Sequence, residues 1–198
     1  MMQRFLLIFC FVMCALMPIS AQSVDADRLG KAISYFQSEK YVEALPIFQD
    51  LDANYNLNPR FRAYLALCYY QTYDFKHSTE IFDEILPQLQ TLSPQELAVY
   101  VFAVAESHFA LQQYEQALPY YKQHIRFCRA DERGDAYFKM AFCQLETENY
   151  VYAYYFLQQA LSYYESYNDT TARQARIHQI GTMLIGAEAQ IKRLINQK

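Results

Sequence analysis

Hydrophobic and polar positions along most of the chain follow the period of an α-helix, and the strict alternation of a half-buried strand is nowhere sustained. Helix starts are marked by a capping side chain before a proline at Asn58-Pro59 and again at Ser93-Pro94. Glu96 lies three residues after Ser93 and completes a capping box. The pattern therefore predicts an all-α protein.

One stretch of this pattern occurs four times. The sequence YVEALPIF at 41–48 returns as YEQALPYY at 114–121, and weaker copies lie at 75–82 and 150–157. Four residues are equivalent, with steps of 34, 39 and 36 residues between them: Ala44, Ser78, Ala117 and Ala153. Self-similarity at this period indicates stacked helical hairpins, because a single hairpin cannot bury its apolar face alone. The longest step predicts a longer connection or an extended helix around residues 90–95.

The repeated segments resemble the tetratricopeptide repeat (TPR), a helix–turn–helix unit of about 34 residues. That family places a small residue and then an aromatic in its first helix. It then places an aromatic residue before the second helix, and an alanine and another aromatic residue within the second helix. The matching residues are, copy by copy, Ala32, Tyr35, Tyr41, Ala44 and Phe48; Ala66, Tyr69, Phe75, Ser78 and Phe82; Ala105, His108, Tyr114, Ala117 and Tyr121; Ala141, Gln144, Tyr150, Ala153 and Leu157. The family's tryptophan is absent from every copy, since the chain has none.

The resemblance implies a right-handed αα-superhelix of about four hairpins within an array at 22–167. The expected repeats lie at approximately 25–58, 59–92, 98–131 and 134–167. Small residues let two helix backbones approach closely, and aromatic side chains fill the space beside them. The equivalent small positions should therefore all be buried.

Residues 168–198 are predicted to form a last helix with a different rhythm. Its apolar residues step alternately by three and four, which makes a seam of about three heptads: Ile177, Ile180, Leu184, Ala187, Ile191 and Leu194. Such a helix could cap the open end of the array or could dimerise. Terminal repeats need a cap, so we favour the capping interpretation.

The first 21 residues have the features of a signal peptide. Arg4 supplies the positive start, an apolar run follows at 5–17, and Pro18 precedes a small residue, Ala21, at the expected cleavage position. The run is shorter than the roughly 20 residues that span a bilayer. These features predict an exported protein without membrane insertion after cleavage. A bacterial periplasmic location is the first choice and secretion the second.

Charge and cysteine content narrow the possible partners. The chain carries 17 basic and 21 acidic residues, and losing Arg4 with the leader would leave 16 basic residues, a balance of −5. This mild acidity and the lack of a basic run argue against nucleic acid and against an anionic membrane surface. Beyond the leader lie Cys68, Cys128 and Cys143. All three lie in apolar stretches of predicted helices, where cysteines are more often buried and reduced. A disulfide between Cys128 and Cys143 is an open alternative.

Enzyme signatures are not found in the sequence. It contains no glycine-rich phosphate loop, no nucleophile elbow and no His-Glu-x-x-His. His77, His108, His124 and His178 are scattered along the chain, and His108 takes a position where the repeat has an aromatic, which favours a packed core histidine. The sequence therefore predicts a protein that is not an enzyme and has no metal or cofactor.

The resemblance implies that the first helices of the repeats line a concave groove that binds a protein or peptide. Their expected inner positions are mainly apolar and aromatic, with Glu106 as the single charge: Leu29, Ile33, Phe36, Leu67, Tyr70, Phe102, Glu106, Phe109, Phe138, Phe142 and Leu145. The competing interpretation is that these side chains only pack between repeats or under the last helix. A long apolar stripe favours a groove that is covered by a partner, by a second copy or by the chain's own end.

The sequence as a whole predicts a non-enzymatic interaction module or scaffold of the bacterial cell envelope, which binds a partner protein or peptide through this groove. The alternative is a structural homodimer that self-associates through the heptad helix or through the groove. The mass of the protein in solution separates the two, because only the second requires a dimer.

Overall fold

The computed structural model describes residues 19–167 and 171–197 of the chain. Every regular element in these ranges is helical, with nine α-helices and two short 3-10 helices, which confirms the all-α prediction. Most of the leader predicted at 1–21 lies outside the described residues. The chain divides into two compact units, Met1–Leu57 and Asn58–Lys198, which we call unit 1 and unit 2 and describe separately.

Unit 1 contains α2 (Ile19–Gln37) and α3 (Tyr41–Tyr55), which pack against each other. Their contact is built on Ala32 in α2 and on Ala44 and Phe48 in α3, each with no solvent exposure. The two alanines allow the helix backbones to approach, and the phenylalanine ring fills the space beside them. Unit 1 therefore has the packing expected of one repeat.

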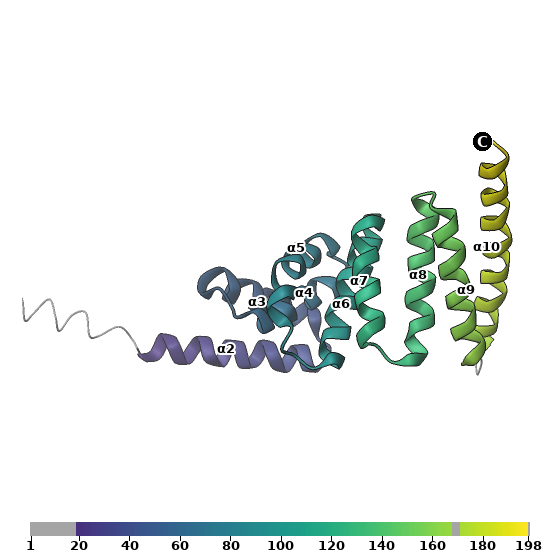
Figure 1. Ribbon diagram of the computed structural model, residues 1–198. Helices are drawn as coiled ribbons and strands as arrows, with labels where there is room; N and C mark the ends of the chain where they lie inside the picture. The colour runs from purple at the N-terminus through teal and green to yellow at the C-terminus, as the bar shows by residue number, and fades with distance from the viewer. Residues whose placement is uncertain (1–18, 168–170, 198) are drawn as a thin grey trace, which may run out of the picture. The chain divides into compact units, whose positions relative to one another are not determined.

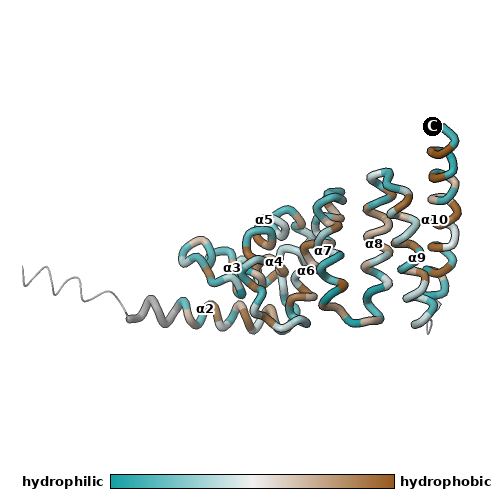
Figure 2. The backbone as a smooth tube through the Cα atoms, in the orientation of Figure 1, coloured by the Kyte–Doolittle hydropathy of each residue, from teal (hydrophilic) through white to brown (hydrophobic). Residues whose placement is uncertain are grey.

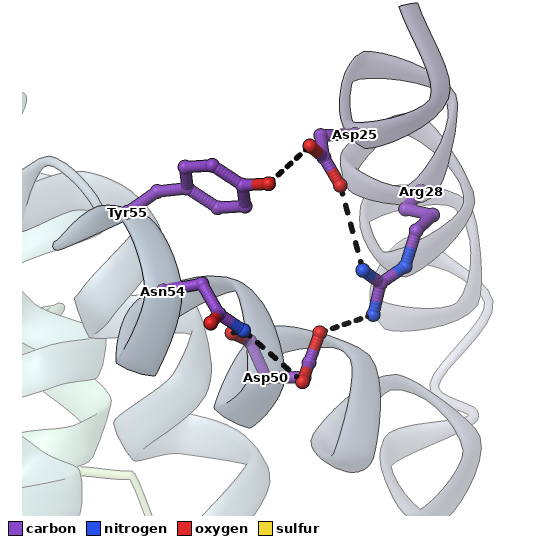
Figure 3. A network of polar contacts seen from close by, with 5 residues as sticks. All are labelled: Asp25, Arg28, Asp50, Asn54 and Tyr55. Carbon is purple, nitrogen blue, oxygen red and sulfur yellow. Dashed lines mark hydrogen bonds and ion pairs between the residues drawn. The ribbon is translucent and has the colours of Figure 1, made fainter. Parts of the chain in front are cut away.

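A polar network connects the exposed sides of α2 and α3 (Figure 3). Arg28 lies at its centre, with Nη2 2.5 Å from Oδ2 of Asp50 and Nη1 3.5 Å from Oδ1 of Asp25. Tyr55 donates its hydroxyl proton to Asp25, and the amide of Asn54 donates to Asp50. Because the groups are largely exposed, solvent and salt weaken these interactions, so they orient the two helices more than they stabilise them.

Unit 2 continues the same architecture with seven α-helices. They are α4 (Pro59–Gln71), α5 (Phe75–Ile85), α6 (Pro94–Ala110), α7 (Tyr114–Phe127), α8 (Arg133–Glu146), α9 (Tyr150–Ser166) and α10 (Thr171–Asn196). Each helix packs against the next one along the chain, and α8, α9 and α10 lie side by side (Figure 1). Figure 2 shows hydrophobic and hydrophilic residues interleaved along these helices, as expected when each helix has both a packed and a solvent face.

Local sequence signals set several helix boundaries in unit 2. The side chain of Asn58 accepts hydrogen bonds from two backbone N–H groups at the start of α4, and Ser93 Oγ accepts one from Glu96 at 3.2 Å at the start of α6. These contacts confirm the predicted N-caps. Between α5 and α6 the chain forms η1 (Leu86–Leu89), a 3-10 helix that buries both of its leucines. The longest repeat step is thus taken up by a packed connection.

The small positions of the repeats have the same environment in all four copies. Each of the following residues has a relative exposure of 0%: Ala32, Ala66, Ala105 and Ala141 in the first helices, and Ala44, Ser78, Ala117 and Ala153 in the second helices. The single hydroxyl in this set, on Ser78, accepts a hydrogen bond from Ser107 in α6 at 3.2 Å. The equivalence predicted from the repeated sequence is therefore confirmed.

The turn inside each hairpin is also repeated, although its sequence gives no warning of it. The backbone is left-handed, with φ between 57° and 64°, at Glu39, Tyr73, Gln112 and Glu148. At each turn the following residue donates its N–H to a carbonyl five residues earlier, as in Gln113 to His108 at 2.9 Å. This is the Schellman arrangement, which usually has glycine at the left-handed position. Four non-glycine residues here accept a conformation that disfavours a side chain.

The last helix, α10, packs against α9. Ile180 and Ala187 are buried against α9, and Ile177 and Leu184 are partly buried beside them, so four residues of the predicted seam face the core. α10 has 26 residues and α9 has 17, which correspond to about 39 Å and about 26 Å at 1.5 Å per residue. α10 consequently extends past α9 (Figure 1), and Leu194 at its end is 47% exposed.

The hydropathy of the helices bears on membrane association. Among the described residues, no helix combines the length and the continuous apolar character that are needed to cross a bilayer.

Candidate partner-binding groove

The predicted groove residues of unit 1 lie on α2. Leu29, Ile33 and Phe36 are each partly exposed. The Phe36 ring meets Tyr41 edge-on at 5.7 Å between centroids, and Phe48 at 6.4 Å. Part of the Phe36 surface is thus buried inside its own hairpin, and the three residues keep some exposed surface.

In unit 2 the middle of the predicted groove is polar and paired. Glu106 on α6 lies 2.8 Å from the ammonium nitrogen of Lys139 on α8 and accepts the hydroxyl proton of Tyr121 at 2.5 Å. The same ammonium group lies 4.3 Å from the centroid of the Phe109 ring. The expectation that Glu106 would be the only charge is therefore wrong, because a lysine from the next first helix reaches across to it. This pair joins α6 to α8.

The aromatic residues around this pair pack mainly on one another. Phe109 lies 5.4 Å from Phe142 on α8 and 5.5 Å from Tyr114 on α7, measured between ring centroids. Both phenylalanines and Leu145 stay partly exposed. The competing interpretation, packing between repeats, thus accounts for part of each of these side chains but not for all of their surface.

Phe138 belongs to a covered part of the stripe. Its side chain is 7% exposed, and the guanidinium carbon of Arg176 on α10 lies 4.2 Å from the centre of its ring. The favourable contact between a cation and an aromatic face fixes the start of α10 there. The chain's own last helix therefore covers this end of the predicted groove.

The remaining predicted residues come together at a pocket. Leu67 and Tyr70 on α4 and Phe102 on α6 line a cavity of about 440 Å³ in unit 2. Val99, which is 52% exposed, lies on its wall one helical turn from Phe102. The polar boundary of the pocket includes Gln71, Gln95, Arg129, Glu132 and Asp135. The stripe predicted from the sequence thus contains a real depression, where apolar walls meet a polar rim.

One corner of this pocket is formed by three residues that were not predicted to belong to a site. His124 near the end of α7, Cys128 at its C-cap and Glu132 in η2 (Ala130–Glu132) each offer a ligand atom, and these atoms lie within 4.8 Å of one another. The His124 ring donates its Nδ1 proton to the carbonyl of Ala98 at 3.0 Å. The imidazole of a neutral His124 therefore keeps the lone pair of Nε2 free.

The electrostatics of this corner follow from burial. His124 is 6% exposed, and burial lowers its pKa because the charged imidazolium is poorly solvated there. Burial likewise raises the pKa of the Cys128 thiol, and the carboxylate of Glu132 adds to this increase. Arg133 acts in the opposite direction on Cys128, since a cation favours the thiolate.

A separate polar cluster lies between α5, α6 and α7. His108 is 4% exposed and stacks on Tyr120 with 5.6 Å between ring centroids, which confirms the prediction of a packed core histidine. Its Nδ1 donates to Gln113 at 2.7 Å and its Nε2 to Asp83 at 3.2 Å, and Tyr120 also donates to Asp83. Burial lowers the pKa of His108, but these hydrogen bonds outweigh it and the pKa is raised. Burial alone would raise the pKa of Asp83, but the hydrogen bonds from His108 and Tyr120 have a larger combined effect in the opposite direction. The pKa of Asp83 is therefore lowered.

The cysteines beyond the leader are not bridged. Cys68, Cys128 and Cys143 are buried free thiols, so the alternative of a Cys128–Cys143 disulfide is not realised in the structure. Burial raises the pKa of the Cys68 thiol to about 12, and it does the same for Cys143. Both of these thiols are therefore protonated and unreactive near neutral pH.

Repeated hairpins with four matching pairs of small contact residues define the chain as a helical-repeat protein with a TPR-like fold. No family model matches the sequence, and no curated protein matches it. Solved structures do match. MamA from strain AMB-1 aligns with a TM-score of 0.63 and 12% identity over 89% of this chain and 94% of that one.

Two further structures have the same fold. The TPR-like repeats of a Podosopora anserina putative kinesin light chain align with a TM-score of 0.57 and 15% identity over 86% of this chain and 92% of that one. The apo form of RapI aligns with a TM-score of 0.59 and 16% identity over 85% of this chain and 64% of that one. At such identities the likeness establishes the fold alone.

Proposed function

We propose that this protein is a non-enzymatic interaction module that binds a segment of a partner protein in the pocket of unit 2. The observation that carries this proposal is the pocket itself, which is lined by residues of the first helices, Leu67, Tyr70 and Phe102. The resemblance to tetratricopeptide repeats implies that first helices supply the inner surface of the array. A cavity of about 440 Å³ holds one or two large side chains, which suits an apolar anchor of a peptide or helix.

The rim indicates what should flank that anchor. Glu132 and Asp135 place two carboxylates at the edge of the pocket, and the chain as a whole has a net charge of −4. Arg129 is also at the edge, but its guanidinium is paired with Asp131 at 3.1 Å. The field at the rim is therefore negative, and a partner segment with a basic residue next to its apolar anchor fits best.

Export to the envelope of a bacterium is the second element of the proposal. It rests on the leader-like sequence at 1–21. α2 begins at Ile19, so cleavage after Ala21 would leave the helix to start at Gln22. Expression in a bacterial host followed by fractionation and amino-terminal sequencing tests this element. A periplasmic product beginning at Gln22 is the expected result, and an uncleaved cytoplasmic product would contradict it.

Site-specific photocrosslinking tests binding at the pocket. We would place the photoreactive residue p-benzoylphenylalanine at Val99, which is 52% exposed on the pocket wall, and at Val42, which is 72% exposed on α3. Both positions tolerate a large side chain because they face solvent. Crosslinks to one discrete protein from Val99 but not from Val42 are expected. Equal labelling from both sites would show that the pocket is not the binding surface.

Self-association is the second candidate, and a specific observation defines where it would occur. The buried part of the α10 seam is used against α9, and the exposed apolar residues of α10 are Ile185, Leu194 and Ile195, of which Ile185 is 72% exposed. A dimer through α10 would have to bury these three side chains. Sedimentation at micromolar concentration separates the candidates, because a monomer excludes the dimer and leaves the interaction module.

A further inference from the structure

The corner of the pocket formed by His124, Cys128 and Glu132 has the donor set of a transition-metal site. An imidazole nitrogen, a thiolate and a carboxylate are the three ligand types that bind Zn²⁺ in proteins. The three ligand atoms lie within 4.8 Å of one another. Tetrahedral coordination would place them roughly 3.3–3.7 Å apart, so the three ligand atoms would draw closer together on binding one ion.

His124, Cys128 and Glu132 are each four residues apart, and in a continuous helix they would extend over more than two turns. The backbone brings them closer together because the helix ends between them. α7 ends at Phe127, and Cys128 has extended backbone angles, φ −73° and ψ 165°. The chain then folds back through η2, where the N–H of Arg129 donates to Oε2 of Glu132 at 2.9 Å. That bond orients the carboxylate and leaves Oε1 available.

The outer contacts of the corner also suit a metal ligand. His124 donates Nδ1–H to the Ala98 carbonyl at 3.0 Å, and metal-binding histidines commonly hold their second nitrogen in this way. The bond fixes the ring with Nε2 as the free donor atom. The Phe102 ring, 5.0 Å from the imidazole between centroids, covers its apolar side. The first ligand is therefore pre-oriented before any ion arrives.

Charge balance agrees with a divalent cation. Loss of the thiol proton to solvent gives the three ligands a charge of −2, which Zn²⁺ neutralises. The neighbouring Arg133 is a cation, and its contact with Cys128 favours the thiolate that the metal needs. On binding, the sulfur would exchange this contact for the metal ion.

We propose that His124, Cys128 and Glu132 bind one Zn²⁺ ion with three protein ligands, leaving a fourth coordination position open toward the 440 Å³ pocket. A closed structural zinc site has four protein ligands, whereas a site with three holds water or an incoming group in the fourth position. This proposal does not depend on partner binding. A metal site and a peptide pocket can each exist without the other.

Cobalt serves as the probe, because Co²⁺ bound to a thiolate has a ligand-to-metal charge-transfer band and Zn²⁺ has no such spectrum. The full chain would carry Cys10→Ser and Cys14→Ser to remove the thiols of the leader. Titration with Co²⁺ should give a thiolate band that saturates at one equivalent per chain. Added Zn²⁺ should abolish that band by displacement, since Zn²⁺ binds such sites more tightly.

Matched variants locate the ion. Cys128→Ala should remove the charge-transfer band, while Cys68→Ala, a buried cysteine outside the pocket, should keep it. Glu132→Gln, at an exposed position that leaves folding intact, should weaken Zn²⁺ binding at least tenfold. His124→Ala should do the same and the exposed His178→Ala should not. Far-ultraviolet circular dichroism would verify that each variant is folded.

Two results would overturn the proposal. The first is the absence of any thiolate band in the folded starting protein at millimolar Co²⁺. The second is a band that survives in folded Cys128→Ala, which would assign it to Cys68 or Cys143. Crosslinking at Val99 is read out separately, so failure of metal binding leaves the partner-binding proposal standing, and the reverse also holds.

Discussion

The left-handed turn residues allow a test in which one substitution has opposite effects at two nearby positions. Gln112 lies in the α6–α7 turn with φ 59°, and Gln116 lies two residues into α7; both side chains are exposed. Gln112→Gly and Gln116→Gly make the same chemical change four residues apart. Their unfolded chains have the same composition, so the difference between them reports the folded backbone.

The expected magnitudes follow from the backbone angles. A left-handed conformation costs a residue with a side chain about 1–2 kcal/mol, and glycine avoids this cost but loses about 0.5–1 kcal/mol more chain entropy on folding. Gln112→Gly should therefore stabilise the protein by about 0.5–1 kcal/mol. Gln116→Gly places glycine inside a helix and should destabilise the protein by about 0.5–1 kcal/mol. The two variants should differ by about 1–2 kcal/mol.

Urea unfolding followed by circular dichroism at 222 nm in the far ultraviolet measures this difference. Tyrosine fluorescence supplies a second probe, since the chain has 19 tyrosines and no tryptophan. The midpoint should rise for Gln112→Gly and fall for Gln116→Gly, with the slope unchanged in both. If Gln112→Gly lowers the midpoint as much as Gln116→Gly does, the left-handed turn is not a source of strain and the reasoning is refuted.

Three further perturbations test the packing and the polar clusters. Ile180→Ala should destabilise the protein by about 2–5 kcal/mol in urea unfolding because it leaves a cavity under α10, whereas Leu194→Ala at the exposed end should change stability by less than about 0.5 kcal/mol. Tyr121→Phe should cost about 1–2 kcal/mol in the same assay, since the partly buried carboxylate of Glu106 loses the hydroxyl group that donates to it; a neutral effect would show that the bond is not formed. The raised pKa of His108 implies that its bond to Asp83 contributes stability fully below about pH 6.5, the unfolded value, and loses it as pH rises through the folded pKa. Stability measured from pH 6 to 9 should therefore fall more steeply in the wild type than in His108→Gln, and parallel curves would contradict the assignment.

The repeat architecture was accessible from the sequence because it depends on side-chain volume. Two helices can approach only where both carry small residues, so Ala105 and Ala117 had to recur at fixed positions, and both are fully buried. The capping residues Asn58 and Ser93 act through bonds to their immediate neighbours, and they too could be recognised locally.

The site was less accessible, for two physical reasons. Long side chains reach across helices, so the pairing of Lys139 with Glu106 depends on helix spacing that no local pattern contains. The corner at His124 depends on where α7 stops and how the chain turns at Cys128. The sequence pattern His-x3-Cys-x3-Glu was the available signal. In a continuous helix it would place the three side chains on successive turns, and they converge here only because α7 ends at Phe127. The left-handed turns were hidden for a related reason, since glycine, their usual marker, is replaced at Gln112 and its equivalents.

Stacking between successive helices in unit 2 limits how far any local change can spread. A change that made α6 and α7 more rigid would slow amide exchange in these two helices and in α5 and α8, which pack against them. The exchange rate of α10, which packs against α9, would stay the same. Repeats could therefore be added without disturbing distant ones. A hairpin inserted between α9 and α10 would lengthen the molecule and leave the pocket beside Phe102 unchanged.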